Sequence, residues 1–535
     1  MVLLFRCNFE VPISIQAFMF WSRTTDIDYS ICDARDIACI CDLYFTDLLQ
    51  RQQQSSISES SDKHQILQGV RNLRIFGKCF LGVSSEIPKY IGEVEKTIFP
   101  MFSQHPPNYV RWNGEESELL FTTKYSTSTT ADISSSHSPS FWRRALHGMS
   151  GRGIVVSVGE SQVDDVRRLI KVLRFLGNEL PIQIVHKGDL SPISQDKIVK
   201  SGRGTFDKKL NALEQEIWFV DSSPCLSSEY FSRFTRYRNK WLPVLFSSFE
   251  EIILMDADTV PVVNPTTLLS NPKFERTGAL FFKDRALLEK MWSSEAALFK
   301  SLFPSQLEQI LFGMEIKTKG IFENTFFKLK RRHLMESGVV VINRKSHLSG
   351  LLMGCHLHMW SLTSEPVHGD KELFWLGQLL SGNTAFEFSD KNAGAIGKLH
   401  CQGKIKSICS TQVAHFSDDG ELLWINGGLS TCKKDTACYD YSQVKELRKE
   451  FSSCESLDSY YKSPITAQAA LIVNHRNPSA LEKLRPSFGW TQNPNLGCLG
   501  YFWCAKGLVE NVRETELILF NNTFIEYLET IANVW

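Results

Sequence analysis

The sequence predicts an α/β protein built on an open sheet, and two observations carry that prediction. After about residue 150, short apolar runs rich in β-branched residues alternate with segments whose apolar residues recur at helical spacing. The order strand, helix, strand, strand, helix, strand is typical of an open α/β sheet. Apolar and charged residues make up 43% and 22% of the 535 residues, ordinary values for a soluble globular chain of about two to four domains.

The first 150 residues differ in composition from the rest. Two polar stretches rich in serine and threonine, Gln52–Asp62 and Tyr125–Ser140, are predicted to be linkers because they offer too little apolar surface to bury. The apolar run Val11–Ser22 is shorter than the roughly 20 residues that span a bilayer, and Glu10 precedes it where a signal peptide carries basic residues. The sequence therefore shows no convincing targeting segment.

The regular part of the chain opens with strands and helices in alternation. A helix is expected over 163–176, followed by Gly177 as a stop signal, and a second helix over 234–249 leads into the apolar run Ile252–Met255. The strands of this part are expected at Gly153–Gly159, Pro181–His186 and Glu216–Asp221.

The second half of the chain continues the α/β pattern, but one segment within it has no clear periodicity. Residues 286–332 carry aromatic and basic clusters without a clear period and are interpreted as an insertion. Further strands are expected at Gly278–Lys283 and Ser337–Asn343, and further helices over 348–362 and 370–380. The predicted regions are therefore an N-terminal region over 1–150, a main α/β domain over 151–445 and a cysteine-containing extension over 446–535.

Charge and cysteine content narrow the classes of function. Lys plus Arg and Asp plus Glu both number 59, so the composition gives no electrostatic reason to expect nucleic acid or an anionic membrane as a partner. None of the 14 cysteines forms a Cys-x-x-Cys pair, which leaves a zinc ribbon or thioredoxin motif unsupported. Seven cysteines crowd between Cys401 and Cys504, a pattern that favours disulfides in a secretory compartment over buried free thiols.

Two carboxylates at a strand end are the strongest candidates for chemistry. Asp256 and Asp258 follow the predicted strand Ile252–Met255, and alternation along a strand places residues two apart on one side. Ligands of open α/β sheets bind outside the carboxyl ends of the strands, and oxygen ligands suit Mg²⁺ or Mn²⁺. The alternative is that the pair merely ends the strand. Asp26-Ile27-Asp28 repeats the tripeptide without a strand before it and is interpreted as a solvated turn.

Three further acidic or imidazole groups could belong to the same site. His415, near the end of an apolar segment, could add a nitrogen ligand to the ion, but a lone histidine of this kind is more often a packed one. Asp370 and Glu372 stand at a predicted helix start, where capping and the helix dipole explain acidic residues well. The functional alternative is a polar wall that faces a sugar.

Basic residues could hold a phosphate beside the Asp pair. Arg236 lies upstream of the pair and Lys283 ends the predicted strand Gly278–Lys283. Arginine forks match phosphate geometry, although most such residues are simply solvated.

Six blocks in this order resemble the fungal α-1,3-mannosyltransferases that extend glycoprotein glycans in the Golgi. The resemblance covers roughly residues 150–430, and its blocks are "GIVVSVG", "RFTRYRNKWLPVLFSSFEEIILMDADTVPVVNP", "GALFFKDR", "ESGVVVINRKSH", "HGDKELFWLG" and "AHFSDDGELLWINGG". It implies a GT-A fold, a Rossmann-like mixed sheet flanked by helices. The metal motif of the family falls on Asp256 and Asp258, its histidine-bearing block falls on His415, and its "GDKE" block falls on Gly369–Glu372.

The resemblance also implies an activity and a setting. It implies transfer of mannose from GDP-mannose to a mannosylated glycan or glycoprotein in α-1,3 linkage, with retention and with Mn²⁺, or Mg²⁺ in its place. The family works at the Golgi membrane with a lumenal catalytic domain, and assembly with other mannosyltransferases is part of that expectation. The family's membrane span is not visible here, although the Ser/Thr-rich stretches could serve as its stem. Two rivals stay open: a GT-A transferase that uses a UDP-hexose, and an inactive homologue that binds glycans or acts as a scaffold.

Overall fold

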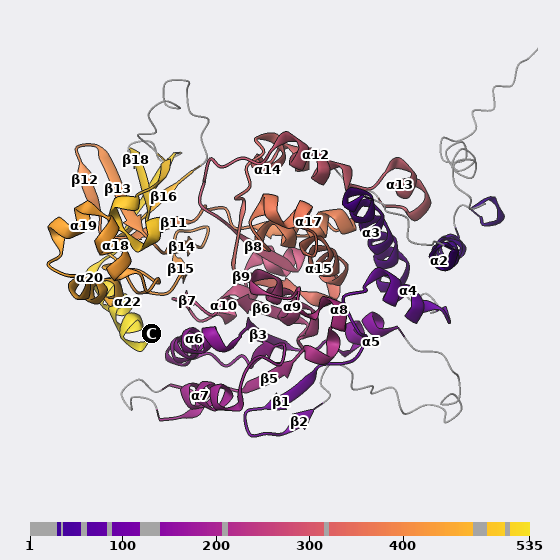
Figure 1. Cartoon of the computed structure of the whole chain (residues 1–535), viewed down its shortest axis with the longest axis horizontal. Helices are drawn as coiled ribbons and strands as arrows, with labels where there is room; N and C mark the ends of the chain where they lie inside the picture. The colour runs from indigo at the N-terminus through magenta and orange to yellow at the C-terminus, as the bar shows by residue number, and fades with distance from the viewer. Residues whose placement is uncertain are drawn as a thin grey trace, which may run out of the picture.

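The computed structural model describes residues 29–33, 36–54, 61–82, 88–117, 140–205, 212–314, 320–474, 489–508 and 514–535. The run Val11–Ser22, residues 55–60 of the first Ser/Thr-rich stretch and residues 125–139 of the second lie outside the described residues. The described ends of the first stretch belong to the helices on either side of it. Within the described ranges, no helix is long and apolar enough to cross a membrane. Figure 1 shows the N-terminal helices at one end, the large sheet with its helices in the middle and the C-terminal strands at the other end.

The central sheet is mixed, with a parallel core. β3 (Arg152–Ser157) pairs in parallel with β4 (Ile182–His186) on one side and with β6 (Glu251–Met255) on the other. β9 (Met335–Asn343) runs antiparallel between β6 and β8 (Ala279–Lys283). The full strand order is β10 (Glu387–Phe388), β8, β9, β6, β3, β4, β5 (Ile217–Asp221), β1 (Asn108–Arg111) and β2 (Glu116–Ser117). The predicted α/β class with a mixed central sheet is confirmed.

Alternating side chains of the sheet face two helical layers. In β3, Ile154 and Val156 pack against α6 (Val163–Phe175), whereas Val155 lies in the cluster with α9 (Trp241–Phe246). The face of Val155 is also covered by α15 (Arg344–His358) and α17 (Lys371–Ser381), while α7 (Pro192–Arg203) lies beside α6 on the opposite face (Figure 1). Burial on both faces explains why the parallel strands read as nearly continuous apolar runs.

The segment before β6 is shorter and more broken than the sequence predicts. The expected helix over 234–249 is a 3-10 turn, Arg236–Lys240, followed by the short helix α9. Arg344 accounts for the early stop, because its buried guanidinium donates to the carbonyls of Val244, Leu245, Ser247 and Phe249. These carbonyls are those that a continuing helix would use. The arginine therefore fixes where the chain turns into β6.

The boundaries of α15 and α17 differ from expectation by a few residues. α15 begins four residues before the predicted 348, because Asn343 caps it by accepting from the Ser346 N–H and the first turn is polar. α17 spans Lys371–Ser381 with Asp370 at the cap position, but the Asp370 side chain makes no cap hydrogen bond. Capping therefore does not explain Asp370.

The described part of residues 29–150 packs into the same core as the main sheet. β1 pairs with β5, and Phe99 and Phe102 each meet Trp142 edge to face within the cluster that also holds α9 and α15. The helices of this part are α2 (Ile37–Gln54), α3 (Asp62–Phe76), α4 (Ile91–Ile98) and α5 (Phe141–Gly148). α2 and α3 carry the disulfides Cys32–Cys39 and Cys41–Cys79 at their ends.

Residues 286–332 form helices that meet these N-terminal ones. The segment lies between β8 and β9 and contains α12 (Ser293–Ser301), α13 (Gln306–Phe312) and α14 (Thr325–Lys328). Arg74 of α3, which is 2% exposed, forms an ion pair with Glu308 of α13 and donates to the carbonyls of Leu302 and Leu380. A buried ion pair thus fastens the insertion to the N-terminal helices.

Two smaller antiparallel sheets complete the C-terminal side. One has the order β19 (Thr515–Leu519), β16 (Ala469–Val473), β11 (Gly394–Gly397), β14 (Val413–Phe416), β15 (Leu422–Asn426) and β7 (Thr259–Pro261). The other has the order β12 (His400–Gln402), β13 (Ile405–Ser410), β18 (Trp503–Leu508) and β17 (Gly489–Gln492). Strands from beyond residue 445 therefore pair with strands from before it.

Three disulfides link segments of this C-terminal region to one another. Cys409 pairs with Cys504, Cys432 with Cys498 and Cys438 with Cys454, while Cys401 is free and exposed. The expectation of disulfides among these cysteines is confirmed for all of them except Cys401.

Replacing Arg74 tests whether the N-terminal helices are an integral part of the fold. Arg74→Met leaves the Glu308 carboxylate buried beside it without its main partner, so we expect a loss of about 3–5 kcal/mol in the free energy of unfolding. The matched control is Arg71→Met, because Arg71 is 39% exposed and only approaches Glu308 at 3.9 Å; its loss should stay below about 1 kcal/mol. Denaturant titration measures both, and equal small effects would contradict an integral role.

Candidate active site

The Asp pair lies where the chain passes from the central sheet into the six-stranded C-terminal sheet. β6 ends at Met255, Asp256 N–H donates to Gly338 O of β9 at 2.9 Å, and Thr259 already belongs to β7 of the second sheet. β6 and β3 also form the point at which the strand order reverses, with β4 and β5 to one side and β9 and β8 to the other. Open α/β sheets bind ligands in the crevice at such a point.

Lys240 connects Asp256 with two other elements. Its Nζ lies 2.9 Å from Asp256 Oδ1 and 3.2 Å from Asp370 Oδ2, and it donates to Ser337 Oγ at 2.9 Å. Ser337 Oγ in turn donates to Asp370 Oδ2 at 2.8 Å. The end of β6, the start of β9 and the start of α17 are therefore held around one ammonium group.

The charges of this cluster shift one another. Burial, together with repulsion from Asp258 and Asp370, raises the pKa of Asp256 to about 7, despite the opposing effect of Lys240. Burial alone would lower the pKa of Lys240, but the carboxylates of Asp256 and Asp370 raise it above its ordinary value. Several carboxylates thus share few cations, and an added cation would relieve their repulsion.

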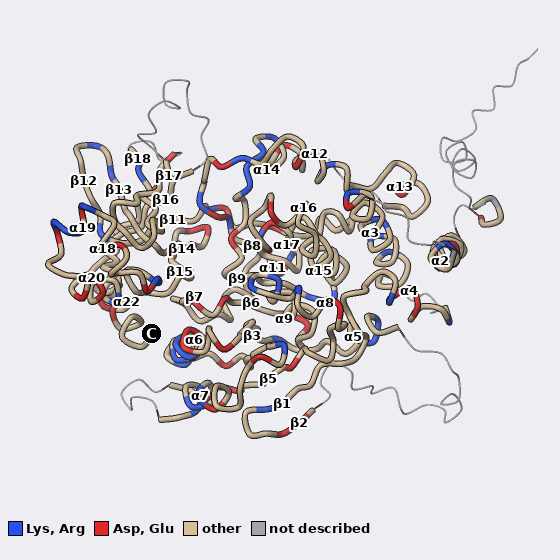
Figure 2. The backbone as a smooth tube through the Cα atoms, viewed as in Figure 1, with Lys and Arg blue, Asp and Glu red and all other residues tan. Residues whose placement is uncertain are grey.

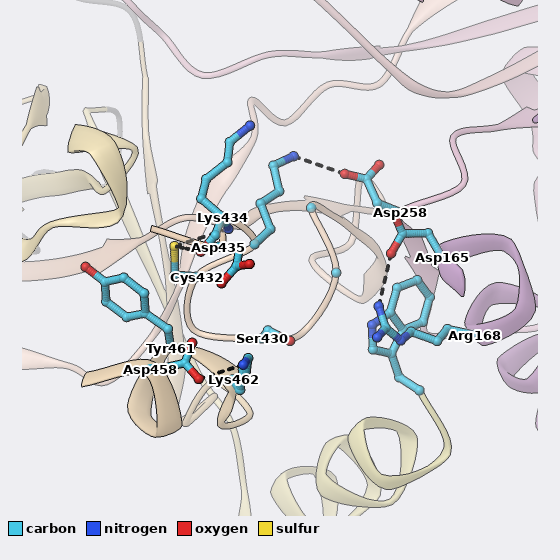
Figure 3. A pocket seen from close by; sticks show the side chains of 14 residues that line it. Asp165, Arg168, Asp258, Ser430, Cys432, Lys434, Asp435, Asp458, Tyr461 and Lys462 are labelled. Carbon is cyan, nitrogen blue, oxygen red and sulfur yellow. Dashed lines mark hydrogen bonds and ion pairs between the residues drawn. The ribbon is translucent and has the colours of Figure 1, made fainter. Parts of the chain in front are cut away.

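Asp258 faces a second lysine across a small pocket. Lys433 Nζ lies 3.0 Å from Asp258 Oδ2, and the N–H groups of Gly427 and Gly428 donate to the Asp258 carbonyl at 3.2 and 2.8 Å. Figure 3 shows Asp258 and Asp165 on one side of this pocket and Lys434 and Asp435 on the other. The pocket has a volume of about 270 Å³ and is lined by Arg168, Ser430, Lys433 and Lys462 among others. The disulfide partner Cys432 precedes Lys433 and ties its loop to Cys498.

The Asp pair fits a hard divalent cation. The side chains of Asp256 and Asp258 are 24% and 29% exposed, so both carboxylates are reachable from solvent, and Asp256 is destabilised as an anion by its acidic neighbours. Mg²⁺ and Mn²⁺ use carboxylates of this kind together with water and substrate oxygens. Asp256 and Asp258 are the residues that would hold the ion.

His415, the third predicted ligand, lies in a buried aromatic environment. Its ring stacks on Trp424 at a centroid distance of 3.8 Å and meets Phe282 edge on, and it is 2% exposed. Burial lowers the pKa of His415 to about 3, and the charged groups that act on it are Asp284 and Arg285. Among the described residues, a group of three metal-ligating side chains within 4.8 Å occurs at Glu289, His333 and His368, not at Asp256, Asp258 and His415.

Glu372 is a buried structural acceptor in this arrangement. It is fully buried, and its Oε1 accepts from the N–H groups of Leu334 and Met335 at 2.7 and 3.0 Å. Its Oε2 accepts from the Trp375 indole at 2.6 Å. Burial raises the pKa of Glu372 to about 7. The side chain fixes the entry into β9, whereas Asp370, two residues earlier, is the acidic residue of this block that joins the Lys240 cluster.

The two predicted basic residues lie away from the Asp pair. Arg236 lines a separate cleft of about 800 Å³ together with Tyr237, Glu365, His368 and Gly369. Lys283 ends β8, where its Nζ donates to the Asp390 carbonyl at 2.8 Å. Lys240 and Lys433 are the basic residues that lie beside the Asp pair, where Arg236 and Lys283 were expected.

A second buried charge network borders the cluster. Lys371 Nζ lies 2.6 Å from Asp284 Oδ2, and Arg285 lies beside the same carboxylate. Although burial alone would raise it, Lys371 and Arg285 hold the pKa of Asp284 well below its usual range. Burial, followed by repulsion from Asp284, raises the pKa of Glu336, which accepts from Asn426 Nδ2 at 3.1 Å.

Sequence reasoning missed several of these residues. Lys240 and Lys433 stand among other charged residues in "RYRNK" and "CKKD", and Glu336 is a single acidic residue in "MES". Their selection depends on contacts with residues 16 to 175 positions away, as between Lys240 and Asp256 and between Lys433 and Asp258. The one local signal was that Lys240 and Glu336 lie inside two of the six blocks that carry the family resemblance.

A mixed α/β sheet with an Asp-x-Asp pair at the end of a central strand, opposite lysines, defines the class of glycosyltransferases with a GT-A fold. A family profile described as "Mannosyltransferase putative" matches residues 151–417. Among solved structures, the mannosyltransferase Ktr4p of Saccharomyces cerevisiae is 10% identical over 60% of this chain and 76% of that chain, with a TM-score of 0.28. That score is too low to align site residues.

Curated relatives give the narrower assignment. Alpha-1,3-mannosyltransferase MNT2 of Saccharomyces cerevisiae is 36% identical over 76% of this chain and 78% of its own length. The probable alpha-1,3-mannosyltransferase MNT4 of the same yeast is 32% identical over 89% of this chain and 84% of its own length. The chain belongs to the α-1,3-mannosyltransferase family.

A double-mutant cycle tests the structural role of Glu372. Glu372→Gln should lower the free energy of unfolding by about 1–3 kcal/mol, because the amide N–H₂ would face the Trp375 indole N–H, one donor against another. Trp375→Phe removes that indole donor, so the double variant should recover part of the loss, as measured by thermal unfolding. Additive losses in the double variant would show that the Glu372–Trp375 hydrogen bond is not what the glutamate contributes.

Proposed function

We propose that this protein transfers mannose from GDP-mannose to a mannose-terminated glycan in α-1,3 linkage, with retention and with a Mn²⁺ ion. Membership of the α-1,3-mannosyltransferase family supports the mannosyl transfer and the linkage. The single structural observation behind the proposal is the pairing of Asp256 with Lys240 and of Asp258 with Lys433 at the switch point of the sheet. Carboxylates for a metal and lysines for phosphates are what a nucleotide-diphosphate sugar requires.

The chain's own residues would divide the work as follows. Asp256 and Asp258 would hold Mn²⁺, or Mg²⁺ in its place, which when bound neutralises charge on a diphosphate leaving group. Lys433 would bind a phosphate oxygen in the 270 Å³ pocket. Lys240 would orient Asp256 and Asp370 toward each other.

Retention is compatible with a same-face route through an oxocarbenium-like state. In that route the leaving phosphate takes the proton of the acceptor hydroxyl, so the protein needs no general base. Asp370 is already engaged by Lys240 and Ser337, and Glu372 is fully buried, which favours this route over a protein nucleophile.

The setting that we propose is the lumenal side of the Golgi membrane. The disulfides within the described residues support an oxidising compartment. The acceptor would be a mannosylated glycan or glycoprotein, and assembly with other mannosyltransferases would bring successive steps together.

A turnover assay tests the Asp pair directly. Purified protein with Mn²⁺, GDP-mannose and an α-mannoside acceptor should release GDP and form an α-1,3-linked product. Asp256→Asn should reduce kcat by about 10²–10³-fold, because it removes a carboxylate that would hold the cation which neutralises the leaving group. The control is Asp26→Asn, which changes the other Asp-x-Asp tripeptide and should keep full activity.

The same assay decides between the rivals. Turnover with a UDP-hexose but not with GDP-mannose would show that the donor is a UDP-sugar. Full activity of Asp256→Asn would contradict a metal site at the Asp pair. No turnover with any mannoside acceptor would favour an inactive, glycan-binding homologue.

Lys433 can be tested against its sequence neighbour. Lys433→Met should raise KM for the donor by about 10-fold or more, because a hydrogen bond to a charged phosphate contributes about 1.5–3 kcal/mol. Lys434→Met serves as the control, since Lys434 lines the same pocket without contacting Asp258, and its KM should change little. If both variants raise KM equally, the phosphate contact does not belong to Lys433 in particular.

A further inference from the structure

Two histidines and a glutamate converge beside the active-site cluster without taking part in it. They are Glu289 in the loop after β8, His333 just before β9 and His368 just before α17. One ligand atom of each lies within 4.8 Å of the others. The two imidazole rings are nearly parallel, at 14°, with centroids 5.2 Å apart. Segments far apart in the sequence therefore present imidazole and carboxylate groups to one point.

The distances match a small ion with tetrahedral coordination. Glu289 Oε2 lies 3.1 Å from His333 Nε2 and 3.5 Å from His368 Nε2. Bonds of about 2.0–2.1 Å from Zn²⁺ to nitrogen or oxygen place neighbouring ligands about 3.4 Å apart in a tetrahedron. The two distances from Glu289 match this spacing, and the ligand atoms of His333 and His368 lie within 4.8 Å of each other.

The protonation states of the group also favour a cation. Arg332 Nη1 lies 3.1 Å from His368 Nε2, and an arginine only donates, so that nitrogen presents its lone pair. The same nitrogen lies 3.5 Å from Glu289 Oε2, so two hydrogen-bond acceptors face each other without a proton between them.

A further carboxylate is placed to orient His333. Lys371 Nζ lies 2.7 Å from His333 Nδ1, and Asp284 Oδ2 lies 3.6 Å from the same nitrogen. A histidine that binds a metal through Nε2 carries its proton on Nδ1, where a carboxylate commonly accepts it. As the side chains stand, Lys371 donates to Nδ1, so the ring proton lies on Nε2 and faces Glu289. Zinc at Nε2 needs that proton on Nδ1, so the Lys371 ammonium must turn away from the ring while it keeps its ion pair with Asp284 at 2.6 Å.

We propose that Glu289, His333 and His368 form a binding site for Zn²⁺, separate from the Asp256–Asp258 pair, with its fourth position open to water. Nitrogen ligands suit zinc better than manganese, whereas the Asp pair offers oxygen alone. The exposed side chains of Glu289 and His368, at 49% and 47%, leave that fourth position accessible. Arg332 competes with the ion for His368 Nε2 and sets the affinity below that of a buried structural site.

Zinc binding to the chelator-treated full chain tests the site. Competition with a chromophoric zinc indicator should give one Zn²⁺ per chain, and Co²⁺ in its place should show the intense visible absorption of a tetrahedral ion. His368→Asn should weaken binding at least 10-fold. The variant should fold, because His368 has a φ of 54°, a left-handed conformation that asparagine tolerates. Glu289→Gln should weaken binding as well.

The controls separate this site from the others. Asp258→Asn and a variant of the exposed His400, His400→Ala, should bind zinc as the unmodified chain does. Arg332→Gln should bind zinc more tightly, because it removes the competing guanidinium. The proposal is overturned if the unmodified chain binds no stoichiometric zinc, if His368→Asn and Glu289→Gln bind it unchanged, or if Asp258→Asn abolishes it.

Discussion

The active centre depends on one ammonium group placed between two carboxylates. Lys240 reaches Asp256 at the end of β6 and Asp370 at the start of α17, and it also bonds Ser337 in β9. Without that charge, the carboxylates of two elements would repel each other at the point where the sheet opens. The positions of the strand end, the helix start and the Asp pair are therefore coupled through Lys240. α9 begins directly after Lys240, and Arg344 fixes the other end of that helix.

The centre lies at a junction, and each side is stabilised in its own way. On the side of the central sheet, Glu372 holds the entry into β9 through two backbone N–H groups and an indole. On the C-terminal side, the Cys432–Cys498 disulfide fixes the loop that carries Lys433. Figure 2 shows Lys and Arg residues spread among Asp and Glu residues over the whole backbone, so the local pairings, rather than a one-signed face, give the site its character.

Two kinds of ligand set lie close together in this chain. The Asp pair offers oxygen atoms, and the group of Glu289, His333 and His368 offers two nitrogen atoms and one oxygen atom. Lys371 links them, because it contacts His333 and directly follows Asp370. The Asp pair would therefore select a hard cation and the histidine-containing group a borderline one, because the two sets differ in ligand type.

The sequence by itself determined the α/β class, most of the strands and the Asp pair, because each depends on a short-range pattern: alternation of apolar residues, helical spacing, or two carboxylates at a strand end. It did not determine Lys240, Lys433 or Glu336, since ordinary charged residues become special only through partners far along the chain. His415 stays a predicted ligand, and the sequence did not show that cross-strand pairing would stack its ring on Trp424. Tertiary structure decided these roles because burial and charge pairing are set by what packs nearby, and local spacing carries no record of that.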